Sequence, residues 1–336
     1  MSTGSLVYET EKTKKQDNHF FAASICAPQK ISLETSPLRK PSPGEVRIKL
    51  QGCGICSSNI PLWQGREWFE YPVPPGNPGH EGWGIVDAVG EDVSNVRIGQ
   101  RVSAISFNAF AEYDYASHDA IVILPAELDG KPFPGEPMGC AMNIYRRSKI
   151  KAGDTVAIIG IGFLGALLTQ VAVCDGARVI AISRKPFSLR VAKNCGADHT
   201  IKMDDHYRIL DEIKAITSGE GCDCVIEATG AQWPLDLAAD IAAEEGRLVI
   251  AGYHQDGLRN VNMQTWNWRA FDVVNAHVRN SDAYVRGIQD AVKAVLDGKI
   301  DPFPLFTHEF SLEQLDKGLN ASIQKPDGYI KGVVKI

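Results

Sequence analysis

The chain has 336 residues, of which 44% are hydrophobic and 23% charged, a composition typical of globular proteins and unlike that of disordered chains. One hydrophobic core rarely supports this length, so two domains are expected. The net charge of −6, with no basic cluster beyond Lys12 to Lys15, argues against nucleic acid as a partner.

The sequence contains neither a stretch of about 18 apolar residues nor a basic N-terminal segment followed by an apolar one. A cytoplasmic protein that does not insert into membranes is therefore expected. The eight cysteines are irregularly placed, and Cys174, Cys195 and Cys224 lie inside apolar runs. They are predicted to be reduced thiols, some of them available to bind metal.

The first part of the chain is predicted to be an all-β lobe that follows a flexible extension. Residues 1–20 show no usable periodicity, and Phe20 and Phe21 are expected to begin the first strand. Between residues 31 and 125, short β-type runs alternate with Pro and Gly, among them 45–51, 84–89 and 120–124.

After Cys140, strand and helix signals begin to alternate, which indicates a parallel, doubly wound sheet. A helix at 283–296 and a Pro-rich turn at 301–304 precede a last β-type segment, 329–336, whose partner the pattern does not identify. Within the alternating part, strands are predicted at 155–159, 178–182, 224–226 and 247–251, and helices at 166–174, 188–194 and 207–217.

A glycine-rich motif, Gly160-Ile-Gly-Phe-Leu-Gly165, follows a predicted strand and opens a helix, which is the context that dinucleotide binding requires. Gly160 permits the tight turn, Gly162 lets a pyrophosphate approach backbone N–H groups, and Gly165 permits close packing of helix and strand. Phe163 and Leu164 complete the predicted cofactor-binding turn. The alternative is a turn with a purely structural role.

The residues after the second strand of such a domain select the cofactor, because an acid there accepts from the ribose 2′-hydroxyl and repels a 2′-phosphate. Here Ser183, Arg184 and Lys185 follow the strand, and no acid is present. A hydroxyl and two cations suit a phosphate dianion. NADP(H) is therefore favoured over NAD(H); in the alternative, the two cations belong to a solvated loop.

Three further motifs precede the glycine-rich turn, namely Gly52-Cys-Gly-Ile-Cys-Ser-Ser-Asn59, Gly79-His-Glu-Gly82 and Gly139-Cys140. With that turn, the ordered set resembles the zinc-containing medium-chain dehydrogenase/reductase (alcohol dehydrogenase) family from about Ile31 to the C-terminus. The resemblance implies an α/β protein with a GroES-like, β-rich catalytic domain and a Rossmann dinucleotide-binding domain. The catalytic domain is expected at 21–142 and 281–336, and the Rossmann domain at 143–280.

The resemblance implies that Cys56, His80 and Cys140 hold a catalytic zinc and that Glu81 lies next to the metal. Two thiolates and a neutral imidazole balance Zn²⁺ and leave a fourth position for water or a substrate oxygen. Taken singly, each residue also has an alternative role. Cys140 could be a packed core cysteine, His80 could be a buried histidine with all its hydrogen bonds made, and the Cys-x-x-Cys pair could be redox-active. Cys53, the other cysteine of that pair, is predicted not to bind the metal.

The chain departs from the family at three places. Many members carry a second zinc on a four-cysteine lobe where this chain has the cysteine-free segment 103–111, so one zinc is expected. Ser58 matches the hydroxyl that passes the substrate proton outward, but Pro61 stands where some members place a relay histidine. Asn59 replaces an aspartate that commonly supports the histidine ligand, which weakens electron donation to the metal.

The implied activity is zinc-dependent hydride transfer between NAD(P)(H) and a secondary alcohol or its ketone, with sugars and polyols among the candidate substrates. The alternatives are a zinc-free, NADPH-dependent enoyl or quinone reductase and a non-catalytic relative. A homodimer or homotetramer is expected. Aromatic side chains at Trp63, Trp68, Phe69 and 266–269 are candidates for the substrate pocket, or for core and subunit contacts.

Overall fold

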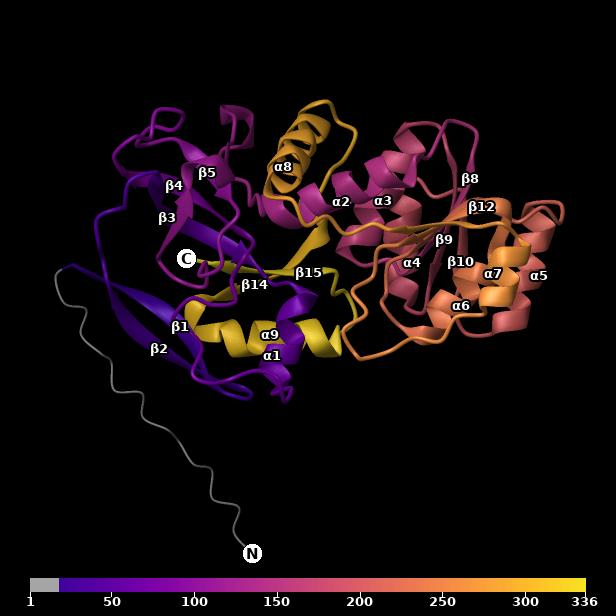
Figure 1. The fold of residues 1–336 in the computed structure, drawn as a ribbon, viewed down its shortest axis with the longest axis horizontal. Helices are drawn as coiled ribbons and strands as arrows, with labels where there is room; N and C mark the ends of the chain where they lie inside the picture. Colours follow the sequence, from indigo (N-terminus) through magenta and orange to yellow (C-terminus); the bar gives the residue numbers. More distant parts are fainter. Residues whose placement is uncertain (1–17) are drawn as a thin grey trace, which may run out of the picture.

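The computed structural model describes residues 18–336, and most of the predicted extension, residues 1–17, lies outside this range. The described chain forms two lobes, a β-rich one made from both ends of the chain and an α/β one made from its middle (Figure 1). The first strand, β1 (His19–Ala27), begins within the last residues of the predicted extension and forms a hairpin with β2 (Lys30–Pro37).

The β-rich lobe is organised around a seven-stranded sheet in the order β14-β15-β3-β4-β5-β7, with β6 also paired to β3. Strands predicted at 45–51, 84–89 and 120–124 are confirmed as β3, β4 and β7. The lobe is not entirely β, because the short α1 (Ile60–Gln64) and α9 (Leu315–Gln324) pack against each other within it. The strands are β3 (Glu45–Gly54), β4 (Gly82–Val89), β5 (Arg101–Ala104), β6 (Tyr113–Ser117), β7 (Ile121–Ile123), β14 (Phe306–Ser311) and β15 (Lys331–Lys335).

The end of the chain returns to the N-terminal strands. β15 pairs in parallel with β14 and antiparallel with β3, where Val333 lies opposite Gly54. Val333 and Val334 are fully buried. This pairing supplies the partner of the last β-type segment and brings residues near position 331 beside the end of β3.

The α/β lobe contains a six-stranded parallel sheet in the order β10-β9-β8-β11-β12-β13, which confirms the predicted doubly wound topology. The strand order reverses between β8 and β11, and ligands bind such sheets beyond the carboxyl ends of the strands at this point. The strands are β8 (Thr155–Ile159), β9 (Arg178–Ser183), β10 (His199–Lys202), β11 (Cys222–Glu227), β12 (Ala242–Ile250) and β13 (Asp272–Asn275).

Helices cover both faces of this sheet. The predicted helices at 166–174, 188–194 and 207–217 are confirmed, although α3 begins three residues earlier than predicted, at Phe163. The helices of this lobe are α3 (Phe163–Cys174), α4 (Pro186–Asn194), α5 (His206–Ile216), α6 (Gln232–Ile241) and α7 (Met263–Trp268).

Two helices, α2 (Gly135–Ser148) and α8 (Ser281–Leu296), lie side by side where the lobes meet (Figure 1). Their backbones approach closely, since a Cβ on Gly287 would lie 2.6 Å from the carbonyl oxygen of Gly139. The helix predicted at 283–296 is α8, whereas α2 was not predicted.

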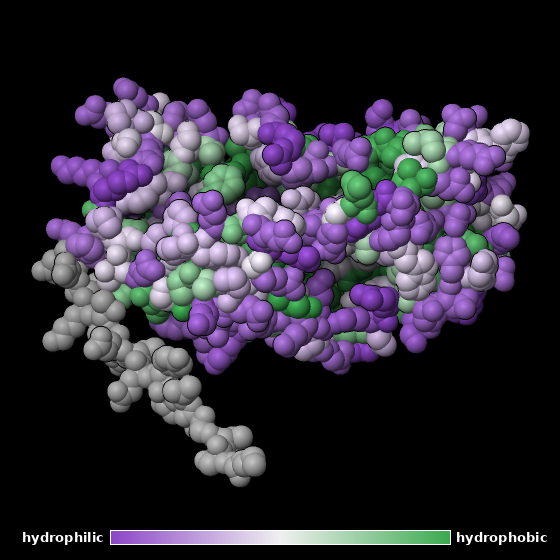
Figure 2. All heavy atoms as spheres, turned by 60° about the horizontal axis from the view of Figure 1, so that its bottom comes forward, coloured by the Kyte–Doolittle hydropathy of each residue, from purple (hydrophilic) through white to green (hydrophobic). Residues whose placement is uncertain are grey.

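Figure 2 shows one face of the molecule, on which hydrophilic side chains predominate and hydrophobic ones are exposed in smaller separate groups. None of the helices in residues 18–336 is long and apolar enough to span a membrane.

Candidate metal centre and cofactor site

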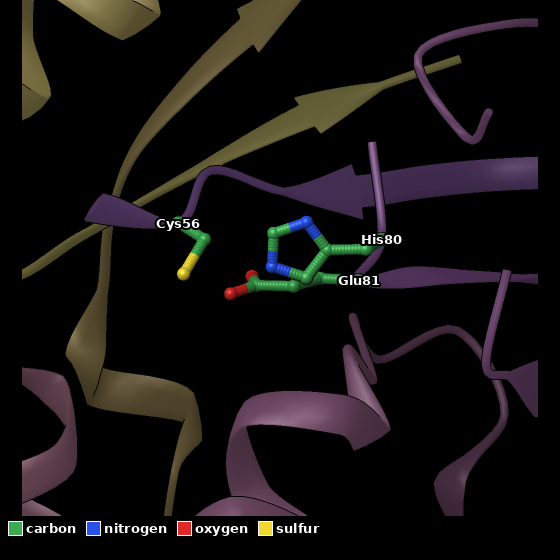
Figure 3. Close-up of side chains that lie close together, drawn as sticks. All are labelled: Cys56, His80 and Glu81. Carbon is green, nitrogen blue, oxygen red and sulfur yellow. The ribbon is translucent and has the colours of Figure 1, made fainter. Parts of the chain in front are cut away.

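Adjacent strands bring three of the predicted metal-site residues together. Cys56 lies just beyond the end of β3, and His80 and Glu81 immediately precede β4. Because β3 and β4 are antiparallel, with Cys53 opposite Gly82, the end of one and the start of the other meet at the same edge of the sheet. Figure 3 shows the sulfur, the imidazole and the carboxylate pointing toward one another.

The potential ligand atoms of Cys56, His80 and Glu81 all lie within 4.8 Å of one another. His80 Nδ1 lies 2.8 Å from the carbonyl oxygen of Pro78, which can only accept, so Nδ1 carries the proton. The other ring nitrogen, Nε2, is 3.5 Å from Ser58 Oγ and is the atom that could bind a metal ion in exchange for its proton.

Asn59 supports the centre through the backbone. Its buried side chain accepts from the N–H of Cys56 at 3.2 Å and donates to the carbonyl oxygen of Pro78 at 3.2 Å. It therefore shares an acceptor with His80 and contacts the loop that holds the imidazole. At this position an amide can perform the positioning role expected of an aspartate, but without its charge.

Glu81 is fully buried and forms an ion pair with Lys331 of β15, which sequence reasoning missed. Lys331 Nζ donates to Oε1 at 2.7 Å; it also lies 2.6 Å from Oε2, but Oε2 has no partner with hydrogen-bond geometry. A Cβ at Gly54 would fall 1.8 Å from Oε2. A glycine at the end of β3 is thus needed to make room for the carboxylate.

Glu136, also missed, adds a second carboxyl group on α2. Cys140 Sγ donates to Glu136 Oε1 at 3.2 Å, one helical turn away. Among residues 18–336, the group of ligand atoms within 4.8 Å of one another does not include Cys140. This cysteine, which was also predicted to bind the metal, contacts Glu136 instead. The i, i+4 spacing of Glu136 and Cys140 would have identified the pair, had the helix been predicted.

The titration of these groups reflects their proximity. Burial lowers the pKa of His80, but the hydrogen bond and charge of Cys56, with the charges of Glu136 and Glu81, outweigh it and raise the pKa to about 10. Burial, followed by the Glu136 charge, raises the pKa of the Cys140 thiol well above its usual range. Burial around its carboxyl also raises the pKa of Glu136, although the residue is partly exposed.

This donor set suits Zn²⁺. A thiolate, an imidazole bound through Nε2 and a carboxylate are ordinary zinc ligands, and Oε2 of Glu81 is a buried acceptor that has the Lys331 charge beside it but no hydrogen bond of good geometry. Cys140 and Glu136 are close enough for their charges to interact with those of the other three. Cys53, in contrast, is buried and donates to the carbonyl oxygen of Gly54, away from the centre.

The glycine-rich turn has the geometry that its sequence predicts. Gly160 has φ of +101°, and a Cβ there would meet Thr229 at 2.5 Å; a Cβ on Gly165 would lie 2.1 Å from the carbonyl oxygen of Gly160. A Cβ on Gly162, the N-cap of α3, would meet nothing within 4 Å. The turn therefore leaves open space at a helix N-terminus, where a pyrophosphate can approach.

Phe163 links this turn to the metal centre. Its buried ring lies 5.3 Å, measured to the centroid, from Nζ of Lys331, the residue paired with Glu81. Leu164 packs against the core of the α/β lobe. Both side chains hold the turn in place, and backbone groups remain available to a cofactor.

A third cation joins the two that the sequence placed after β9. Ser183 is buried at the end of the strand, Arg184 is exposed, and Lys185 Nζ donates to the carbonyl oxygen of Lys325, at the end of α9. No carboxylate within residues 18–336 forms an ion pair with these three cations. Loss of solvent around their ammonium groups, and then the charges of the neighbouring cations, lower the pKa of Lys185 and Lys325; the charge of Asp327 opposes this at Lys185.

The aromatic residues do not form one pocket. Trp63 is fully buried and donates to Asn320 at 2.9 Å, so it belongs to the core between α1 and α9. Phe69 and Trp266 pack against two different hydrophobic cores, and Trp268 is 85% exposed. Trp63, Phe69 and Trp266 therefore pack in or against hydrophobic cores and do not line a common substrate pocket.

Comparison with known families identifies both lobes. Residues 42–126 match the alcohol dehydrogenase GroES-like domain, and residues 164–296 match the zinc-binding dehydrogenase domain. The L-threonine 3-dehydrogenase of Bacillus subtilis is 30% identical over 305 residues, which cover 82% of this chain and 86% of that protein. The chain belongs to the zinc-containing medium-chain dehydrogenase/reductase family. As a member, it is an NAD(P)-dependent oxidoreductase of the alcohol dehydrogenase type.

Other members of this family agree over nearly the full length. A sorbitol dehydrogenase of Bacillus subtilis is 26% identical, covering 93% of this chain and 96% of that protein. A zinc-binding dehydrogenase from Sinorhizobium meliloti, solved bound to NADP, superimposes with a TM-score of 0.81 at 25% identity, covering 95% and 99% of the two chains. The 2R,3R-butanediol dehydrogenase of Bacillus subtilis gives a TM-score of 0.80 at 25% identity, covering 94% and 99%.

Proposed function

We propose that this medium-chain dehydrogenase oxidises a secondary alcohol to its ketone, with one zinc per chain and with NADP⁺ in preference to NAD⁺. The observation that carries the proposal is the convergence of Cys56, His80 and Glu81 within 4.8 Å. When bound, zinc supplies polarisation of the substrate oxygen and NADP⁺ accepts the hydride. A zinc-free reductase would have no use for this donor set, and metal analysis separates the two activities.

Within this proposal, the residues of the chain have distinct roles. Cys56, His80 and Glu81 bind the metal, and the fourth protein contact comes from α2, through Cys140 or Glu136. Lys331 forms an ion pair with the buried Glu81 and holds it in place. Ser58, whose hydroxyl lies 3.5 Å from His80 Nε2, contacts the substrate oxygen and passes its proton on.

The first substrates to test are secondary alcohols with a polar group on the neighbouring carbon. Threonine, sorbitol and butanediol, after which several relatives are named, all carry such a hydroxyl. A screen of secondary alcohols, sugars and polyols with both NAD⁺ and NADP⁺, read as cofactor absorbance, tests substrate and cofactor together; no reduction with any of them would contradict the proposal.

The NADP(H) preference rests on the cations beyond β9. Arg184, Lys185 and Lys325 lie together without ion-pair partners among the described residues, so a phosphate dianion would relieve their mutual repulsion. The first turn of α4, which begins at Pro186, adds the positive end of a helix dipole.

The proposal also includes a cytoplasmic location and a homodimeric or homotetrameric assembly. Size-exclusion chromatography with light scattering tests the oligomeric state.

Replacing Ser58 by Ala is expected to reduce kcat about tenfold while zinc content stays near one per chain, because the hydroxyl contributes to proton transfer and not to ligation. The measurement is turnover with the best alcohol of the screen, beside metal analysis of the same sample. The exposed neighbour Ser57 provides a matched control, Ser57→Ala, which should retain full turnover. Equal rates for wild type and Ser58→Ala under single-turnover conditions would remove Ser58 from the mechanism.

A further inference from the structure

The helix that follows Ser58 offers no side chain that could carry a proton onward. Pro61, three residues after Ser58, is buried in α1 and has no group that exchanges a proton. Alcohol oxidation releases one proton for every hydride transferred. Another part of the molecule must therefore carry this proton away once a cofactor covers Ser58.

The packing of α8 on α2 brings Tyr284 of α8 into the region next to Cys140. Gly139 and Gly287 allow the two helices to approach closely, and Asn143 Nδ2 of α2 donates to the carbonyl oxygen of Ala283 at 2.9 Å. Tyr284 lies three residues before Gly287 and hence on the same face of α8. Since Cys140 follows Gly139 directly, Tyr284 lies in the stretch of α8 that packs beside the candidate ligands of α2.

Electrostatic effects agree with this placement. Burial raises the pKa of Tyr284, and the charges of Cys140 and Glu136 raise it further; the charge of Arg279 opposes them, and that of Cys56 makes a smaller contribution in their direction. The phenol is thus close enough to sense the centre. It remains protonated at neutral pH and can act as a hydrogen-bond donor.

Tyr284 also contacts a histidine that reaches solvent. Its Oη lies 3.2 Å from His277 Nε2, and the two rings meet edge to face with centroids 6.1 Å apart. Tyr284 is half-buried and His277 is exposed. Burial, followed by the charge of Arg279, lowers the pKa of His277, so at pH 7 its imidazole is neutral and offers a lone pair to the phenol.

We propose that Tyr284 and His277 carry the proton of the substrate hydroxyl from the metal centre to solvent. Ser58 accepts the substrate proton as it passes its own proton on toward Tyr284 Oη. Tyr284 in turn passes its proton to His277 Nε2, and His277 releases the proton on Nδ1 to water. The hydride goes to NAD(P)⁺, so each turnover yields ketone, reduced cofactor and one proton. This inference rests on the proposed alcohol oxidation.

The test compares Tyr284→Phe, His277→Gln and the control Tyr145→Phe in single-turnover oxidation of an alcohol by the zinc-loaded enzyme. Tyr145 is a half-buried tyrosine of α2 whose pKa is raised by burial and by Asp175, away from the metal centre. We expect about a tenfold slower reaction for the first two variants and no change for the control. Zinc content and cofactor KM should stay as in wild type. Added imidazole should restore part of the rate of His277→Gln and none of that of Tyr284→Phe.

A readout that does not depend on turnover is the nitrogen chemical shift of His277. In wild type the hydrogen bond from Tyr284 should keep Nε2 an acceptor and the proton on Nδ1, and Tyr284→Phe should shift the tautomer equilibrium. Unchanged single-turnover rates for Tyr284→Phe, or a His277→Gln defect that imidazole does not restore, would overturn the proposal. A wild-type enzyme that oxidises no alcohol would instead contradict the proposed function.

Discussion

His80→Ala and Cys56→Ser are expected to remove most of the bound zinc and to lower turnover by about a thousandfold or more. A metal ion contributes several kcal/mol of charge stabilisation, and about 4 kcal/mol corresponds to a factor of a thousand in rate. The folded structure should survive, because the three ligands lie at an edge of the sheet and the strands are held by buried residues such as Val46, Ile48 and Val334. Metal analysis, kcat and thermal melting of the same preparations provide the measurement.

Cys53→Ala is the matched control for the cysteine variant. Cys53 belongs to the same Cys-x-x-Cys segment but donates to the carbonyl oxygen of Gly54, so this variant should keep its zinc even if it loses some stability. Loss of zinc from Cys53→Ala together with full retention in Cys56→Ser would reverse the assignment of the pair. Two zinc ions per wild-type chain, or none, would contradict the single catalytic site.

The same measurement decides between the two residues of α2. Cys140 is the ligand that the family resemblance implies, whereas Glu136 is the carboxyl group that the structure adds beside it. We expect Glu136→Gln to cost more zinc than Cys140→Ser, because the charge of Glu136, unlike that of Cys140, is among the main causes that raise the pKa of His80. The opposite order would restore Cys140 as the ligand.

The parts of the site that the sequence predicts are those encoded in short segments. Gly160 and Gly165 could be assigned roles because a tight turn and a close helix–strand contact each depend on a few consecutive residues. Cys56 and the His80-Glu81 pair could be assigned because their short motifs, in this order ahead of the glycine-rich turn, resemble those of the family.

The missed residues depend on contacts between distant segments. Lys331 reaches Glu81 only because β15 pairs with β3, a contact across 250 positions, and Lys325 meets Lys185 across 140. No local pattern indicates either contact. Helix α2 was missed for another reason, since Gly135, Pro137 and Gly139 disfavour a helix, and close packing against α8 overrides that preference.

Arg184→Ala is expected to weaken NADP(H) binding by about 1.5–3 kcal/mol, the range for hydrogen bonds to charged groups, which is roughly a ten- to hundredfold rise in its KM if KM follows binding. NAD(H), which has a hydroxyl in place of the phosphate, should be affected much less. Lys325→Ala should act in the same direction, because its ammonium faces the same cluster from the other lobe. Lys299→Ala, whose cation pairs with Asp175 elsewhere on the α/β lobe, is the control and should leave both cofactors unchanged.

Ser183→Asp should reverse the preference and not merely weaken it. A carboxylate at the end of β9 would repel the 2′-phosphate and could accept from the free 2′-hydroxyl of NAD(H), so both effects move the ratio of kcat/KM toward NAD. Ser183 is only 8% exposed, so a larger side chain there could also disturb the packing. The variant Ser183→Ala, measured together with Ser183→Asp, separates the effect of the new charge from that of altered packing. Comparing kcat/KM for both cofactors across wild type and these variants gives the answer. If wild type already prefers NAD(H) and neither Arg184→Ala nor Ser183→Asp alters the ratio, the three cations are a solvated surface and not a phosphate site.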